Sequence, residues 1–161
     1  MLTRFQRIMF LNGLTICLIG LIGGFLLIFS ILGGISLSPV PLVLDYQIPG
    51  TPAAWKAVHV GNIMNGLMAI IFALALPKLT LTRAAKKFVA YGTILTIWGN
   101  ACFYVFGVFA PNRGLSLGDN SLGEGNWAGV LAFTPAFIGA LVLIAVVIVM
   151  IKGISKDVAE D

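Results

Sequence analysis

Charged residues divide this chain into four long uncharged stretches. Each stretch has more than 20 consecutive positions without Asp, Glu, Lys or Arg. An α-helix of about 20 residues crosses roughly 30 Å of hydrocarbon. The pattern therefore predicts an all-α integral membrane protein, a single four-helix transmembrane domain over 1–161 with a short polar tail over 152–161. The spans are expected near 9–35, 57–77, 89–110 and 127–151.

The positions of Lys and Arg predict the orientation in the membrane. The chain is 59% hydrophobic and 10% charged, whereas soluble domains have about 25% charged residues. Eight of the ten basic residues lie at the N-terminus, in the 78–87 loop or in the tail. The positive-inside rule then places both termini and that loop in the cytoplasm, as in an inner (plasma) membrane protein. The net charge of +4 thus reflects topology and contact with anionic lipid, and we expect no nucleic-acid partner.

Glycines and prolines predict local features. Gly20 and Gly24 are spaced for close helix approach, either within the chain or in self-association. The four prolines between positions 36 and 55 favour extended or turn backbone, and Thr51-Pro52 favours a helix start. The Gly- and Asn-rich segment over 111–127 is expected to form a folded lid, and Pro135 to kink the last span.

Polar residues inside the spans are confined to two helices. His59, the only histidine, precedes Asn62 and Asn65 on a stripe that drifts by about 60° per step, so a large flat ligand could contact all three. The third span carries Thr96, Asn100 and Tyr104 at four-residue spacing, which places them on one face. At 1.5 Å per residue, Asn65 and Tyr104 both lie about 12 Å below the outer boundary. This shared depth indicates a functional site between the second and third spans.

These residues exclude several chemistries. All six acidic residues lie in loops or the tail, so a buried carboxylate relay, a Ser-His-Asp triad and a carboxylate pair lack their residues. Zinc needs three or four ligands, which one histidine and two cysteines in the middle of separate spans do not supply. A haem needs only one axial ligand and an apolar slot, and a single histidine leaves an open iron face for ligand or Lewis-acid chemistry. The alternative is structural: a histidine bonded to a carbonyl, and asparagines that join helices.

Four motifs in order resemble the styrene oxide isomerase family. They are I-P-G-T-P-x-x-W-x-x-x-H over 48–59, N-G-L-M over 65–68, W-G-N-x-x-F-Y over 98–104 and P-N-R-G-L over 111–115. The resemblance implies a homotrimer with haem b at the subunit interfaces that isomerises aryl epoxides to aldehydes. It places the axial ligand of the iron on His59 and the active-site asparagine and tyrosine on Asn65 and Tyr104. At the position of Thr96 the family has an aspartate, and threonine cannot carry the negative charge of that residue.

The implied mechanism uses ferric haem b as a Lewis acid on the epoxide oxygen, followed by a 1,2-hydride shift. Asn65 and Tyr104 would orient the epoxide, with Asn62, Thr96 and Asn100 as accessory residues and Phe103 and Phe106 near the aryl group. Two other functions stay open: a haem-bearing electron-transfer or anchor subunit, and a cofactor-free tetraspan assembly protein. The sequence does not identify the epoxide.

Overall fold

The computed structural model describes residues 1–157 and consists of four long helices, with a short connection between the second and third and longer loops over 33–51 and 108–126. The helices are α1 (Arg4–Leu32), α2 (Pro52–Ala75), α3 (Arg83–Gly107) and α4 (Trp127–Asp157). A single 3₁₀ turn, η1 (Leu76–Lys78), follows α2 directly. All four helices are long and apolar enough to cross a membrane, so the prediction of four apolar helices is confirmed.

Capping residues set where the helices begin, and they lie outside the uncharged stretches. The Thr3 side chain accepts a hydrogen bond from the Gln6 amide, and Thr82 does the same for the Ala85 amide. Thr51 caps α2 and Pro52 takes its first turn, as predicted. Helices α1, α2 and α3 therefore start five or six residues earlier than the predicted spans, because a helix end in the headgroup region tolerates charge.

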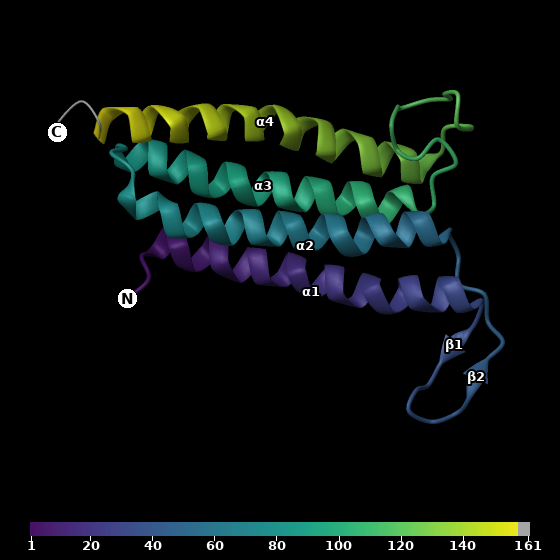
Figure 1. The fold of residues 1–161 in the computed structure, drawn as a ribbon. Coiled ribbons are helices and arrows are strands. Elements are labelled where there is room, and N and C mark those ends of the chain that lie inside the picture. Colours follow the sequence, from purple (N-terminus) through teal and green to yellow (C-terminus); the bar gives the residue numbers. More distant parts are fainter. Residues whose placement is uncertain (158–161) are drawn as a thin grey trace.

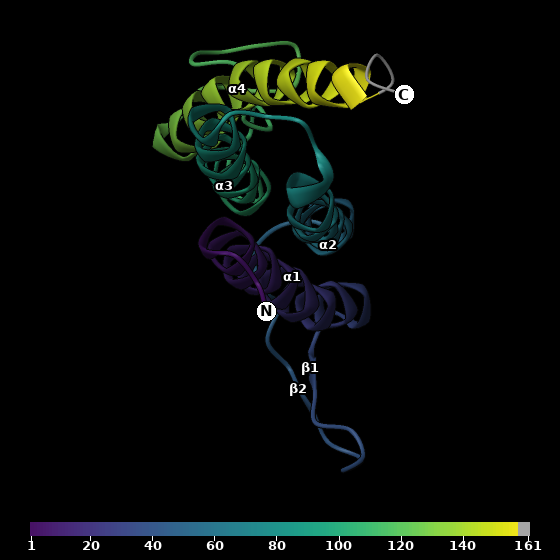
Figure 2. The ribbon, with the colours of Figure 1, turned by 90° about the vertical axis from the view of Figure 1, so that its left-hand side faces the viewer.

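The helices form two layers, α1 with α2 and α3 with α4, and α2 also packs on α3 (Figures 1 and 2). The N-terminus and the end of α4 lie at the same end of the bundle (Figure 1). Glycines allow the close contacts. A β-carbon on Gly20 would stand 2.9 Å from the Ile63 side chain, and one on Gly99 would stand 2.5 Å from the Pro135 carbonyl oxygen. The Gly20–Gly24 face therefore serves packing within the chain.

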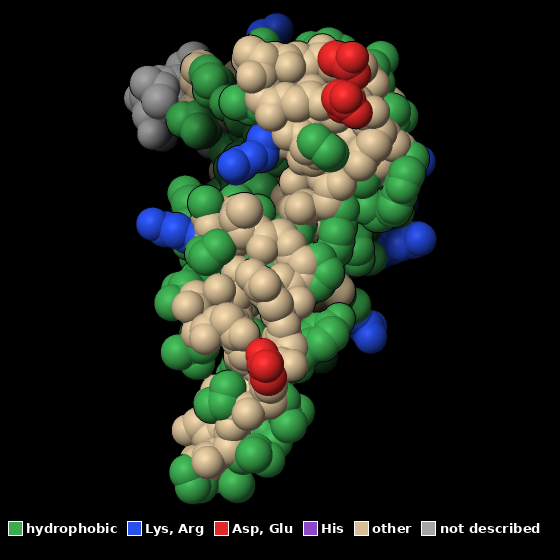
Figure 3. All heavy atoms as spheres, turned by 90° about the vertical axis from the view of Figure 1, so that its right-hand side faces the viewer, with side chains coloured by type: hydrophobic (Ala, Val, Ile, Leu, Met, Phe, Trp, Pro, Cys, Tyr) green, Lys and Arg blue, Asp and Glu red, His purple; other side chains and the backbone are tan. Residues whose placement is uncertain are grey.

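Two loops lie at the other end of the bundle, where the surface is mostly backbone and polar side chains flanked by apolar ones (Figure 3), and the first loop projects away from the helices (Figure 1). The first forms an antiparallel hairpin of β1 (Ile35–Ser36) and β2 (Val43–Leu44), which fits the predicted extended backbone. The second, before α4, is folded around buried Asn112, which donates to the carbonyls of Ser116 and Gly118 and accepts from the Gly114 amide. The prediction that this segment is folded is confirmed, and we refer to it as the lid.

Candidate functional site

The imidazole of His59 packs against α1 at two glycines, Gly20 and Gly24. Its Nδ1 lies 2.9 Å from the Gly20 carbonyl oxygen. Gly24, one turn further along α1, faces the ring so closely that a β-carbon there would stand 2.8 Å from Nδ1. Any larger residue at position 24 would push the ring away from α1. From the sequence, these glycines were interpreted only as helix-packing residues; the signal for their second role is that they lie at the same level of the bundle as His59.

This contact determines which ring nitrogen is available. A carbonyl oxygen can only accept a hydrogen bond, so Nδ1 must carry the proton. In the neutral ring the lone pair then resides on Nε2, for which the described residues offer no hydrogen-bond partner. The side chain is half-buried. Metal-binding histidines usually donate their second N–H to a carbonyl or carboxylate in this way.

A second polar group lies between α2 and α3. Asn100 Nδ2 donates to Asn65 Oδ1 at 2.7 Å, and Asn65 Nδ2 donates to the Gly61 carbonyl at 2.8 Å. The Tyr104 ring lies directly over Gly61, where a β-carbon would stand 2.4 Å from the ring. The predicted proximity of Asn65, Asn100 and Tyr104 is thus present in the structure, and nothing in the sequence indicated that Gly61 would support the Tyr104 ring.

Tyr104 borders two adjoining hollows at the loop end of the bundle. One, of about 430 Å³, lies between α2, α3 and the lid, and the other, of about 300 Å³, lies between α3, α4 and the lid. Such volumes fall at the lower end of the range for small-molecule pockets. Their shared walls are Phe103, Tyr104 and Leu115, and the smaller hollow also exposes Asn100. Phe106 lines neither hollow; it packs edge-on against Trp127, with ring centroids 6.2 Å apart.

Two of the predicted accessory residues lie elsewhere. Asn62 is fully buried; its Nδ2 donates to the Val58 carbonyl of its own helix, and its Oδ1 has no partner. Thr96 is also fully buried and donates its hydroxyl to the Gly139 carbonyl of α4 at 2.9 Å. The four-residue spacing placed Thr96 and Asn100 on one face of α3, but Thr96 joins α3 to α4 while Asn100 joins α3 to α2.

His59 and the Tyr104 group occupy different sides of α2. Positions 59 and 61 are about 200° apart around an α-helix, and His59 contacts α1 whereas Gly61 supports Tyr104 of α3. Between them, Asn62 is fully enclosed and Asn65 is only 8% exposed. A single chain therefore presents no open face on which one flat ligand contacts His59, Asn62 and Asn65 together.

Fold and site together define a class of protein: a bundle of four apolar helices, each able to cross a membrane, with one half-buried imidazole and a separate polar group between helices. A family model described as styrene oxide isomerase matches residues 5–155. A styrene-oxide isomerase of Pseudomonas fluorescens is 34% identical over 150 residues, which cover 92% of this chain and 88% of that protein. The chain belongs to the styrene oxide isomerase family.

Proposed function

We propose that this chain is a membrane enzyme that isomerises aryl epoxides of the styrene oxide type to aldehydes, with ferric haem b held by His59. Family membership supports the reaction. The observation that carries the cofactor assignment is the hydrogen bond from His59 Nδ1 to the Gly20 carbonyl, because it leaves the Nε2 lone pair for the iron. When bound, the haem supplies a Lewis acid for the epoxide oxygen.

The chain's own residues then bind and orient the epoxide. The described residues give the Tyr104 hydroxyl no hydrogen-bond partner, so it is free to donate to the oxygen as negative charge develops there. The Asn65–Asn100 bond, 2.7 Å long, holds two amides in place beside it. Orientation matters because the benzylic C–O bond breaks, a hydride moves from the oxygen-bearing carbon to the benzylic carbon, and C=O forms, with no atom gained or lost.

The apolar walls protect this rearrangement from water. The smaller hollow is lined by Phe103, Phe133, Phe137 and Leu115 as well as by Asn100 and Tyr104. Water in the hollow would add to the benzylic cation and give a diol instead of an aldehyde. The aromatic rings also suit an aryl group, whose face and edge pack well against other rings.

We further propose that the complete site forms across a subunit boundary in a homotrimer, within the inner membrane and with both termini in the cytoplasm. His59 faces the α1 side of α2 and Tyr104 the α3 side. A haem on one chain's His59 can therefore meet a Tyr104 group only if a neighbouring chain supplies it. The positions of the basic residues support the orientation.

The visible spectrum of the detergent-purified protein tests the proposal. We expect a haem spectrum with one axial place open to added ligands, and production of phenylacetaldehyde from styrene oxide. The variant His59→Ala should lose haem and activity together, whereas Tyr91→Phe, at the opposite end of α3, should lose neither. A low-spin spectrum with both axial places held by the protein would indicate an electron-transfer subunit. A preparation that stays colourless after haem is added, or aldehyde formation without haem, would also refute the assignment.

A further inference from the structure

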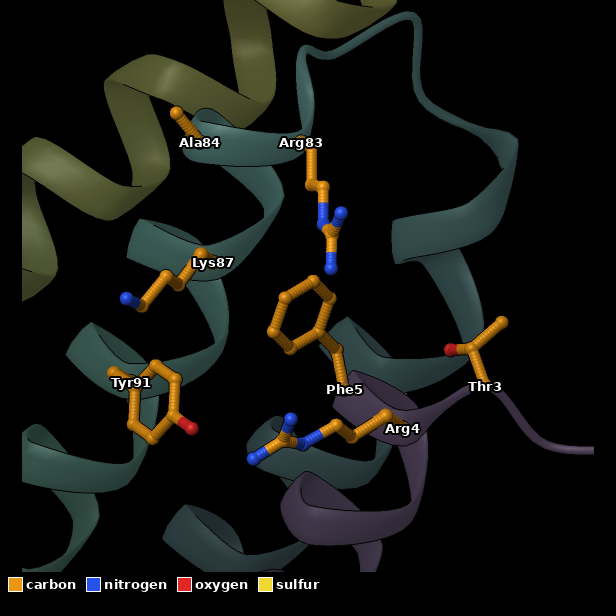
Figure 4. Close-up of a pocket in the computed structure, with 7 residues that line it drawn as sticks. All are labelled: Thr3, Arg4, Phe5, Arg83, Ala84, Lys87 and Tyr91. Carbon is orange, nitrogen blue, oxygen red and sulfur yellow. The ribbon is translucent and has the colours of Figure 1, made fainter.

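Three basic side chains surround a hollow of about 720 Å³ at the end of the bundle that carries the N-terminus. Arg4 comes from the first turn of α1, and Arg83 and Lys87 come from the first turns of α3. In Figure 4 the two arginines extend toward the space around Phe5, the Tyr91 hydroxyl points toward Arg4, and Lys87 lines the α3 side with its ammonium group directed away from Phe5. Two helices distant in sequence thus direct positive charge into one space.

Within the part of the chain that the structure describes, no acidic side chain supplies a counter-charge to these cations. No carboxylate of the described residues lies within ion-pair distance of Arg4, Arg83 or Lys87. The first turns of α1 and α3 contain no acidic residue. Basic side chains there also oppose the positive ends of the helix dipoles, so the arrangement is unfavourable until an anion is present. All three side chains are exposed, which leaves them free to reach one.

An apolar groove continues from this hollow along α3. It has a volume of about 500 Å³ and shares Ala84, Lys87 and Tyr91 with the hollow. Further along, its walls are Phe88, Leu95 and Val142. Residues 84–95 extend about 16 Å along the helix axis at 1.5 Å per residue. The groove therefore runs from the charged end of the bundle toward its apolar middle, as an acyl chain does in a leaflet.

We propose that the hollow and the groove together bind one anionic phospholipid. Its phosphate lies among Arg4, Arg83 and Lys87, and one acyl chain follows the groove past Phe88 and Leu95. Guanidinium groups and an ammonium are the usual partners of phosphate oxygens in proteins. A free phosphate would satisfy the cations but leave the groove empty, so the continuity of the two spaces favours the lipid. The assignment does not depend on haem or on the epoxide reaction.

Native mass spectrometry of the detergent-solubilised full chain, titrated with defined lipids, tests the proposal. We expect phosphatidylglycerol to bind at least tenfold more tightly than phosphatidylcholine, and more tightly than a phosphatidylglycerol with six-carbon chains. The double variant Arg4→Gln/Lys87→Gln should bind phosphatidylglycerol about 30-fold more weakly, at about fivefold per basic charge near the headgroup. The double variant Arg7→Gln/Lys86→Gln removes the same two residue types from the same two helices outside the hollow, and should change affinity less than threefold.

Three results would overturn the assignment. Equal affinity of the two double variants would show that only total charge matters. Equal binding of phosphatidylcholine would show that the phosphate site contributes nothing. Inorganic phosphate that binds as tightly as the long-chain lipid would identify a free-phosphate site. Size-exclusion chromatography of each variant verifies that it is folded, and because all four substituted residues lie outside the apolar contacts of the core, we expect normal folding.

Discussion

Replacing Gly24 with Ala should weaken haem binding without changing any residue that contacts haem or substrate. The added β-carbon would stand 2.8 Å from His59 Nδ1 and 3.0 Å from Cε1. Ordinary van der Waals contact begins near 3.4 Å, so the ring must retreat from α1 by about 0.6 Å. Because Gly20 lies on the same helix, that movement lengthens the 2.9 Å bond to its carbonyl to about 3.5 Å, where a hydrogen bond is almost lost.

The energetic consequence follows from the role of that bond. A neutral hydrogen bond contributes about 0.5–1.5 kcal/mol net. When the bond orients a metal ligand, its loss typically lowers metal affinity by about 10–100-fold. We therefore expect Gly24→Ala to raise the dissociation constant of haem by about 10–100-fold while the helices stay folded.

Titration of haem into the purified apo-protein, followed by the Soret absorbance, measures this effect. Gly107→Ala is the matched control, because its β-carbon would meet only the Arg113 carbonyl oxygen at an ordinary 3.5 Å. A second measurement needs no haem. His59 is the only histidine, so the rate at which diethyl pyrocarbonate acylates an imidazole, followed by the absorbance of the modified ring, reports on how far the ring becomes more accessible when it moves away from α1. Haem affinity and modification rate both unchanged in Gly24→Ala would refute the reasoning.

Three further predictions follow from the contacts on α2 and α3. Gly61→Ala places a β-carbon 2.4 Å from the Tyr104 ring, so we expect at least a tenfold lower turnover of styrene oxide with unchanged haem content; normal turnover would exclude Tyr104 from the reaction. Thr96→Val removes the 2.9 Å bond to the Gly139 carbonyl and should lower stability by roughly 0.6–1.7 kcal/mol with the haem spectrum preserved; an altered spectrum would instead place Thr96 near the haem. Asn62→Leu removes the unpaired Oδ1, whose burial costs about 1–3 kcal/mol, so the melting temperature in detergent should not fall; a marked fall would show that Oδ1 has a partner, such as a buried water.

Much of the fold could be predicted because membrane insertion acts on each residue separately. A charge in hydrocarbon is costly wherever it lies, so the uncharged stretches locate the four helices without any knowledge of their packing. Local rules were equally informative at Thr51-Pro52, where a side-chain cap and a fixed φ start α2 as predicted. The shared depth of Asn65 and Tyr104 followed from the constant rise of a helix, and the structure places both beside Gly61.

The partner of each polar side chain could not be predicted in this way. Depth depends on one helix alone, whereas the neighbour that a side chain meets depends on how the helices pack around one another. The stripe of His59, Asn62 and Asn65 was interpreted as one surface, but α1 covers the first, the bundle encloses the second and α3 binds the third.

The sequence by itself thus determined the four helices, the level of each polar side chain along the bundle and the types of residue available for chemistry, because these follow from the solvation of single residues and from helix geometry. Only the tertiary structure decided that Gly20 and Gly24 contact the His59 ring and that Gly61 contacts the Tyr104 ring. It also placed His59 and Tyr104 on opposite sides of α2. A glycine in a helix can contact the backbone of a neighbouring helix or make room for one of its side chains. Which of the two occurs depends on how the helices pack.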